Sequence, residues 1–346
     1  MSFERISTGL RGMLVLLCGV GAGVMSTPAS SQQSAPAAAP LPVFRTAAIT
    51  NPDPSRWALE VIKRKKLDAK HGFDLQFALK PVSVAYTEFI NGSDPVCLCL
   101  TIATGARFLT QGVDVGLLWT YQAFSHAYIV TENPAIKTPA DLAGHSLAGS
   151  TGSGSWVFQQ YFLTRHQNVD LSKVQIPSIV QVSQAAHLIA KRVDAVTVYE
   201  DGKIALEAAQ PGRFRFIPTF DTDKWKSETG LGHLPMFLFA VRASWYAQPA
   251  NSELVRRFYA AYREAIADMV SDPKQTAALL GDKAEAPPAF VINTLTQYPE
   301  NSTPTLTSTY RETVRILTQK LLPQTGLLDR PLTDEEVNRF VLELRP

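Results

Sequence analysis

The chain has 346 residues, 45% of them hydrophobic and 18% charged, so it can bury a sizeable core and is too apolar to be disordered. Lysine and arginine total 33 against 31 for aspartate and glutamate, which excludes the dense basic stripe that nucleic-acid binding needs. Three cysteines are too few for a disulfide-framed scaffold.

The first 40 residues have the order of a secretory signal peptide followed by a spacer. Arg5 and Arg11 form a basic start, an apolar run extends from Met13 to Met25, and residues 26–40 are rich in Ala, Ser, Gln and Pro. A membrane anchor is the alternative, but it would need ~20 apolar residues, and glycines interrupt this shorter run. We therefore predict an exported protein, with residues 1–40 as signal peptide and spacer.

Short apolar runs then alternate with helical patterns, which is typical of an α/β fold. Helix starts are marked by Asp53-Pro54 and by the capping boxes at Thr138–Asp141 and Thr333–Glu336. Strands are predicted at 43–49, 73–79, 96–100, 113–119, 126–130, 146–149, 174–176, 193–199, 214–218 and 236–241. Helices are predicted between them at 53–72, 85–90, 102–109, 138–144, 156–166, 182–191 and 202–209. A helical C-terminal segment is predicted at 253–270, 273–280, 288–297, 305–322 and 333–344.

This order suggests two lobes, the second inserted into the first. We assign residues 41–131 together with 240–346 to lobe I and residues 132–239 to lobe II. Each lobe is expected to hold a mixed sheet flanked by helices.

A glycine- and serine-rich turn is the most informative local feature. Residues 150–155 read Ser-Thr-Gly-Ser-Gly-Ser between a predicted strand and helix. Backbone N–H groups at a helix N-terminus form an anion site, and Ser150, Thr151, Ser153 and Ser155 add neutral hydroxyl donors. A plain flexible turn is the alternative. A nucleotide-hydrolysing phosphate loop is excluded, because no Lys-Ser or Lys-Thr follows the glycines.

Aromatic residues gather at the predicted strand ends. Trp119 and Tyr199 end strands, and Trp156 follows the glycine turn. Ligands of open α/β sheets bind at the carboxyl ends of strands, so these residues are candidate walls for a small organic ligand, with core packing as the alternative. Glu200 follows Tyr199, and its carboxylate is a candidate partner for a donor group of the ligand or a cap of the next helix.

Metal and catalytic patterns are weak. The six histidines are dispersed and form no zinc-binding spacing, so no metal, cofactor or catalytic residue is predicted. Cys97 and Cys99 would point to one face of a strand, where a disulfide would be strained, so two buried thiols packing as small hydrophobic residues are favoured.

Four segments, read in order, resemble the periplasmic substrate-binding proteins of nitrate, sulfonate and taurine ABC importers, whose superfamily includes thiamine-pyrimidine precursor binders. The resemblance spans residues 43–270 and is most specific at Lys137–Ala148, with weaker matches at Lys65–Leu75, Glu88–Asp94 and His187–Val196. Pro95 with the Cys97 and Cys99 pair, and Arg192 before Val193-Asp194, depart from the family pattern.

The resemblance implies a two-lobed periplasmic binding protein of type II that closes by a hinge over its ligand. Carried onto this chain, the family's site points to Asn51, Thr101 and Tyr199 together with the serines and Thr151 of the glycine turn. The expected function is delivery of a small organic anion, a sulfonate or an aromatic or heteroaromatic acid, to an ABC permease of the inner membrane by a monomer. The alternative is an enzyme on the same fold, desulfinase-like with a nucleophilic cysteine or pyrimidine-synthesis-like.

Overall fold

The computed structural model describes residues 40–50 and 52–345. The predicted signal peptide and spacer, up to residue 39, and the predicted site residue Asn51 lie outside the described residues. From Leu41 onward the chain forms one compact unit.

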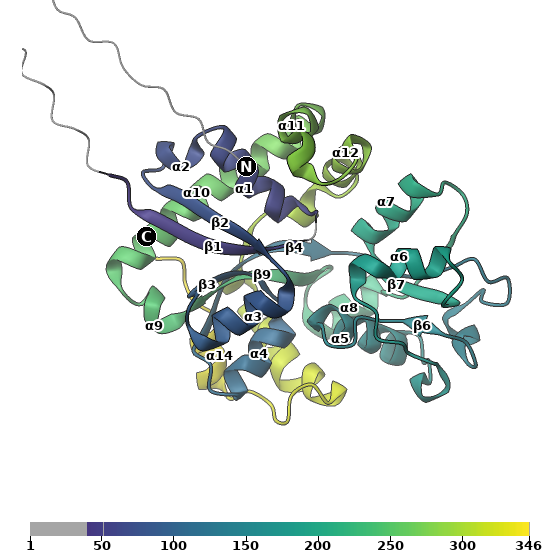
Figure 1. The fold of residues 1–346 in the computed structure, drawn as a ribbon. Helices are drawn as coiled ribbons and strands as arrows, with labels where there is room; N and C mark the ends of the chain where they lie inside the picture. Colours follow the sequence, from purple (N-terminus) through teal and green to yellow (C-terminus); the bar gives the residue numbers. More distant parts are fainter. Residues whose placement is uncertain (1–39, 51, 346) are drawn as a thin grey trace, which may run out of the picture. The chain divides into compact units, whose positions relative to one another are not determined.

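A mixed sheet of six strands is built from both ends of this unit (Figure 1). Its order is β10-β4-β9-β3-β1-β2, in which β1 runs parallel to β2 and β3, and β9 runs antiparallel to β3 and β4. The strands are β1 (Val43–Ile49), β2 (Asp74–Lys80), β3 (Val96–Leu100), β4 (Val115–Phe124), β9 (Leu234–Arg242) and β10 (Thr305–Leu306).

A second mixed sheet has four strands in the order β6-β7-β5-β8, with β6 parallel to β7 and β5 antiparallel to β7 and β8. Its strands are β5 (Ala127–Thr131), β6 (Leu147–Ala148), β7 (Ala195–Tyr199) and β8 (Arg215–Pro218). The prediction of an α/β fold with two mixed sheets flanked by helices is therefore confirmed.

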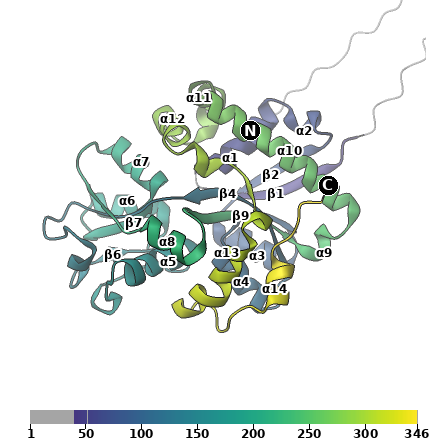
Figure 2. The same cartoon turned by 180° about the vertical axis from the view of Figure 1, so that it is seen from behind.

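Helices cover both faces of the six-stranded sheet, as Figures 1 and 2 show from opposite sides. One face carries α1 (Pro54–Arg64), α2 (Leu67–Lys70), α10 (Pro249–Ser271), α11 (Pro273–Leu280) and α12 (Pro288–Gln297). The other carries α3 (Val82–Asn91), α4 (Ile102–Thr110), α13 (Arg311–Ile316) and α14 (Asp334–Phe340). The two-residue period of a strand sends Ala48 and Leu98 into the first layer and Ala47 and Cys97 into the second.

The four-stranded sheet is also packed on both faces. On one face Trp156 and Leu163, which follow the glycine turn, join Ile129 of β5. On the other, Leu188 and Leu206 pack against the opposite side chains of β5 and β7. The helices here are α5 (Gly154–Tyr161), α6 (Gln181–Ile189), α7 (Glu200–Ala209) and α8 (Thr222–Thr229), and a short α9 (Ala243–Tyr246) follows β9.

Several element predictions need correction. Residues 174–176 form no strand, and Gln175 makes only an isolated bridge with Ser146, followed by a second isolated bridge between Gly149 and Ser178. Helices α8 and α9 were not predicted. The helix expected from residue 305 starts later, because Thr305 and Leu306 pair with β4, as suits the β-branched Thr305.

The two sheets are connected at Ser125–His126, between β4 and β5, and again in the segment between β8 and β9. Strand β5 lies in the four-stranded sheet, although residues up to 131 were assigned to lobe I. We therefore propose that the lobe boundary lies near residue 125 rather than 131. The division into two hinged lobes stays a prediction.

Candidate ligand-binding site

A cavity of about 440 Å³ is formed by elements of both sheets, which is a suitable size for a small organic molecule. The glycine turn supplies one wall, and residues at the carboxyl ends of β1, β2 and β3 supply the opposite wall. Its lining residues are Ile49, Thr50, Pro81, Val82, Ser83, Tyr86, Cys99, Thr101, Ser150, Gly152, Ser153, Gly154, Ser155, Val180, Gln181 and Phe237.

Among the described elements, four helices present their N-terminal residues to this cavity. Pro81–Ser83 begin α3, Thr101 caps α4, Ser153–Ser155 begin α5, and Val180 and Gln181 begin α6. A helix N-terminus carries a partial positive charge and N–H groups without a partner inside the helix. Four of them around one space form a strong site for an anion.

The four N-termini differ in how their N–H groups are satisfied. Thr101 accepts a hydrogen bond from the N–H of Thr104 at 3.0 Å, and Ser153 accepts one from the N–H of Trp156 at 3.3 Å. Pro81 and Val180, which precede α3 and α6, provide no side-chain cap in the described structure. The carbonyl oxygens of Pro81 and Val180 accept from the N–H groups of Val84 and Ser183, so the N–H groups that precede these two in α3 and α6 are the ones available to a ligand.

Of the described residues that line the cavity, none is Asp, Glu, Lys, Arg or His. An anion would therefore be held mainly by backbone N–H dipoles and by the Ser150 hydroxyl, because the hydroxyls of Thr101 and Ser153 already donate to Thr104 Oγ1 at 3.0 Å and to the carbonyl oxygen of Ser150 at 2.8 Å. Ile49, Val82, Tyr86, Val180 and Phe237 form the apolar part of the lining. Together they suit a molecule with an anionic head and an apolar or aromatic body.

Close packing fixes the glycine turn. A Cβ atom added to Gly154 would overlap the Oγ1 atom of Thr101, and one added to Gly149 would overlap the ring of Trp156. Gly152, in the same turn, has open space around the corresponding position. Glycine at 154 therefore lets the N-termini of α4 and α5 come into close contact in the cavity wall.

Only some of the predicted site residues line the main cavity. Thr101, Ser150, Ser153 and Ser155 line the cavity as predicted. Trp156 and Tyr199 are buried beside it and line a smaller adjoining cavity, and the Tyr199 hydroxyl donates to the carbonyl oxygen of Ser155 at 2.9 Å. Thr151 lies outside the cavity lining, exposed, and its hydroxyl donates to Ser178 Oγ at 2.7 Å.

The prediction for Trp119 is corrected. Strand β4 continues to Phe124 instead of ending at Trp119, so this residue lies in mid-strand and not at a strand end. Its fully buried ring stacks on Phe239 with centroids 3.8 Å apart and contacts Phe258 and Tyr262 of α10. Trp119 therefore belongs to the core under α10, as the core-packing alternative had it.

Glu200 holds the connection between the sheets. Its Oε1 atom accepts hydrogen bonds from the backbone N–H groups of Ser125 and His126, both at 2.6 Å, and lies 3.2 Å from His126 Nδ1. Beside it, burial raises the pKa of Asp201 to about 7, and the carboxylates of Glu200 and Asp53 add to the rise. Glu200 is thus placed to stabilise the crossing at Ser125–His126 and lines a separate small cavity rather than the main one.

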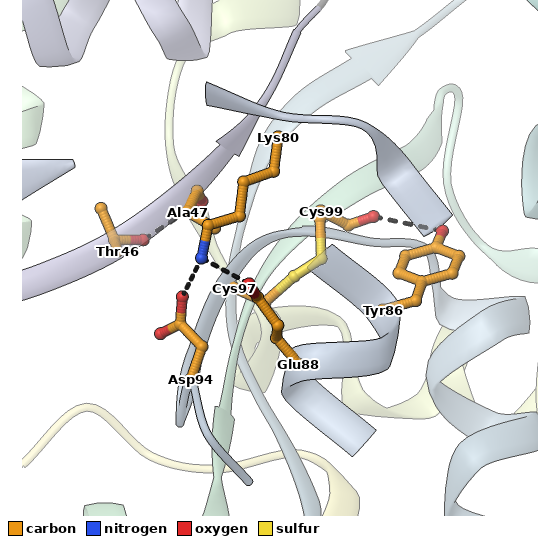
Figure 3. Close-up of a disulfide and its surroundings, with 8 residues drawn as sticks. All are labelled: Thr46, Ala47, Lys80, Tyr86, Glu88, Asp94, Cys97 and Cys99. Atoms are coloured by element: carbon orange, nitrogen blue, oxygen red, sulfur yellow. Dashed lines mark hydrogen bonds and ion pairs between the residues drawn. A yellow bond between two sulfur atoms is a disulfide. The ribbon is translucent and has the colours of Figure 1, made fainter. Parts of the chain in front are cut away.

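The expectation of two separate thiols is wrong, because Cys97 and Cys99 are joined in a disulfide (Figure 3). Pairing with β9 passes from Leu98 to Leu100, which leaves Cys99 as the extra residue of a bulge. The two Cα atoms are 5.2 Å apart, within the usual range for a disulfide, whereas a regular strand would hold them roughly 6.6 Å apart. Cys99 lines the cavity, and its carbonyl oxygen accepts a hydrogen bond from Tyr86 at 3.3 Å.

Sequence reasoning missed Pro81–Ser83, Tyr86, Val180, Gln181 and Phe237. The rule that drew attention to the glycine turn, a helix start after a strand, also applies to Pro81 after β2. It was not applied because the helices were expected to begin at residues 85 and 182, later than they do. Phe237 gives no such signal, since it lies within β9.

Within residues 40–50 and 52–345, no three His, Cys, Asp or Glu side chains are grouped so that they could hold a metal ion. Over the same residues, no helix has the length and apolar character that crossing a bilayer requires.

The sequence of residues 92–276 matches the NMT1/THI5-like family. The chain belongs to this family. The resemblance to nitrate, sulfonate and taurine binding proteins seen in the sequence is thereby confirmed. No protein of curated function matches this NMT1/THI5-like chain significantly in sequence.

Solved structures with the same fold cover nearly all of the described chain. The periplasmic aliphatic sulphonate binding protein SsuA of Escherichia coli is 17% identical, with a TM-score of 0.63 over 87% of this chain and 92% of its own. The alkanesulfonate-binding protein SsuA of Xanthomonas axonopodis pv. citri, bound to MOPS, is 17% identical, with a TM-score of 0.65 over 88% and 97%.

A third structure is the Candida albicans CA3427 gene product, described as having the generic periplasmic binding protein fold. It is 14% identical, with a TM-score of 0.60 over 86% of this chain and 94% of its own. At these identities the likeness of all three structures concerns the fold.

Proposed function

We propose that the chain is an exported solute-binding protein that delivers a small organic anion, a sulfonate or an aromatic or heteroaromatic acid, to an ABC permease of the inner membrane. The observation that carries this proposal is the convergence of four helix N-termini on one cavity whose described lining has no charged side chain. The family and the fold of the sulfonate-binding proteins support the same function.

Closure of two lobes over the ligand is part of the proposal. Val82, at the start of α3, is 36% exposed, and Val180, before α6, is 63% exposed. Both line the cavity, and they come from elements that pack on different sheets. Closure would remove this apolar surface from water and would add to the affinity for a ligand with an apolar body.

Thermal denaturation of the purified protein with sulfonates, aromatic acids, pyrimidines and nitrate tests the ligand class. We expect stabilisation by at least one organic sulfonate or aromatic acid, because ligand binding to the folded state raises its stability. Nitrate should have little effect, since it cannot use the apolar walls. No stabilisation by any organic anion would contradict the proposal.

A variant pair tests the location of the site. Thr101→Val keeps the side-chain shape but removes the cap of α4, and it should weaken binding of the stabilising anion about tenfold, because it takes a polar group from the lining and leaves the N–H of Thr104 without its cap. Thr151→Val is the matched control, because Thr151 is exposed and lies outside the lining. Equal affinities in the two variants would place the ligand elsewhere.

Export and partnership are tested on cells. Cell fractionation should recover the protein in the periplasm with a mass reduced by part of residues 1–40, and size-exclusion chromatography with light scattering should give a monomer. Uptake of the identified anion should depend on the protein and on the permease. Recovery of the full-length chain in the cytoplasm would contradict export.

The competing enzyme on the same fold needs a cysteine thiolate. Here both candidate thiols are joined in a disulfide. Turnover of a bound sulfonate or pyrimidine that begins only after reduction of this disulfide, and that is lost in Cys97→Ser, would favour the enzyme. Binding without turnover under both conditions favours transport.

A further inference from the structure

A small polar cavity adjoins the main one and shares Ser150, Ser155 and Gln181 with it. Its other lining residues are Trp156, Gln159, Gln184, Thr197 and Tyr199. We call it the amide subsite, for its two buried glutamines. Its volume is about 10 Å³, enough for a single non-hydrogen atom with its protons.

The two glutamines are almost completely buried, Gln159 in α5 and Gln184 in α6, at 2% and 3% exposure. Gln159 Nε2 donates to the carbonyl oxygen of Val198 at 3.3 Å, and Gln184 Nε2 donates to that of Ile179 at 3.1 Å. Because both partners are carbonyl oxygens, which only accept, each amide must direct its NH₂ group toward its partner. The orientation of both side chains is thereby fixed.

This arrangement leaves the side-chain carbonyl oxygens of both glutamines without a hydrogen-bond partner in the described structure. In the described structure the Oε1 atoms of Gln159 and Gln184 are buried and have no hydrogen-bond partner. An unpaired buried carbonyl is unfavourable, and native proteins seldom leave one without a role. Two of them in the lining of one small space, one from α5 and one from α6, form a site for a hydrogen-bond donor.

We propose that the side-chain oxygens of Gln159 and Gln184 accept hydrogen bonds from an uncharged NH₂ group on an aromatic or heteroaromatic ring of the bound anion. This inference rests on the proposed function and adds a specificity element to it. The anionic head lies at the helix N-termini of the main cavity, and the amino group enters the amide subsite. Its two protons match the two acceptor oxygens.

Other donors fit less well. A hydroxyl has one proton and would leave one glutamine oxygen unpaired. An alkylammonium group would lose its hydration without gaining a carboxylate, since no Asp or Glu is among the described residues that line either cavity. An aryl amine is uncharged near neutral pH and avoids that cost.

Calorimetric titration of the unmodified protein tests the inference with matched probes. Benzenesulfonate is the parent, and sulfanilate, metanilate and orthanilate carry an amino group at the three ring positions. One of these isomers should bind about tenfold more tightly than the parent, as one well-satisfied buried polar pair allows. Hydroxybenzenesulfonate should show a smaller gain and aminomethylbenzenesulfonate, an ammonium, none.

Two variants from different helices test the glutamines themselves. Gln159→Leu and Gln184→Leu should each reduce the preference for the favoured amino isomer to within about twofold of benzenesulfonate. Binding of benzenesulfonate itself should be retained. Gln160→Leu, next along α5 and outside both cavities, is the control and should keep the wild-type preference.

The outcomes separate the inference from the proposed function. Equal binding of the parent and all amino isomers, unchanged in the glutamine variants, would overturn the inference, would indicate that water fills the subsite, and would leave the anion site intact. Failure of every probe, parent included, would count against the proposed function as well. If the leucine variants unfold, the wild-type isomer series still decides.

Discussion

Two cavities of this protein differ in whether the polar groups in their lining already have hydrogen-bond or ion-pair partners. The larger, about 600 Å³, lies along β1 and β2 and is lined by Lys80, Glu88 and Asp94. There Lys80 is paired with both Glu88 and Asp94 (Figure 3), and Arg45 Nε donates to Gln76 Oε1 at 3.2 Å, so the charged side chains already have protein partners. The main cavity of about 440 Å³, described above as the candidate ligand site, has no charged residue in its described lining, yet four helix N-termini face it. Unsatisfied hydrogen-bonding capacity, more than volume, indicates where a ligand binds.

The largest effect is expected from a substitution in the lining of the main, uncharged cavity. Gly154→Ala should weaken binding of any organic anion by more than about tenfold, because the added methyl group overlaps Thr101 and overpacking costs about 1–3 kcal/mol. Calorimetric titration measures the change. Gly152→Ala is the control, since its methyl group meets open space, and a similar loss in both variants would contradict the explanation.

A second test concerns the disulfide, which Figure 3 shows between the Lys80 cluster and Tyr86 of the uncharged cavity. Peptide mapping with an alkylating agent should label Cys97 and Cys99 only after reduction. Replacement of both by alanine should lower the free energy of unfolding by about 1–2 kcal/mol, the entropic contribution of so short a loop. Labelling of the unreduced folded protein would show that the pair is not joined.

A third test concerns Asp201, which lines the same small cavity as Glu200. The pKa of this carboxyl is raised by burial from 3.8 to about 7 in the folded protein, so between these values the folded state binds the additional proton. The contribution of Asp201 to stability therefore falls as pH rises through that window and is lost above about 7. Asp201→Asn should gain stability relative to the wild type at pH values above about 7 and show no gain near pH 4.

Urea denaturation across this pH range measures that difference. Asp329→Asn is the control, because Asp329 is exposed, and its stability should follow the wild type throughout. A constant difference between Asp201→Asn and the wild type at all pH values would contradict the assignment.

The smallest effect is expected in the charged cavity. Lys80→Met removes one partner of Glu88 and Asp94 and should lower stability by about 1 kcal/mol or less, because the side chains are partly exposed. Affinity for the organic anion should stay within about twofold of the wild type. A loss as large as that of Gly154→Ala would mean that the larger cavity is the binding site.

The alternation of short apolar runs with helical patterns predicted the α/β fold and most strands, because a buried strand such as β3 is a continuous apolar run. Serines and glycines of the turn at 150–155 were found because that turn chemistry is local. Trp119 was misassigned because strand length depends on pairing with β9, which lies more than a hundred residues away. The disulfide depended on a bulge, and Gln159 and Gln184 on the carbonyl groups that orient them; both are tertiary effects that a single sequence does not display.

The position of β9 has a consequence for the order of folding. The four-stranded sheet uses only residues 127–218, whereas β9, residues 234–242, lies between β3 and β4 in the other sheet. During synthesis, β3 and β4 therefore cannot be joined in one sheet until the ribosome has passed Arg242 and β9 is complete. Pairing at such a sequence separation is slow, so the smaller sheet should form first, and the centre of the larger one should form only when β9 inserts between β3 and β4.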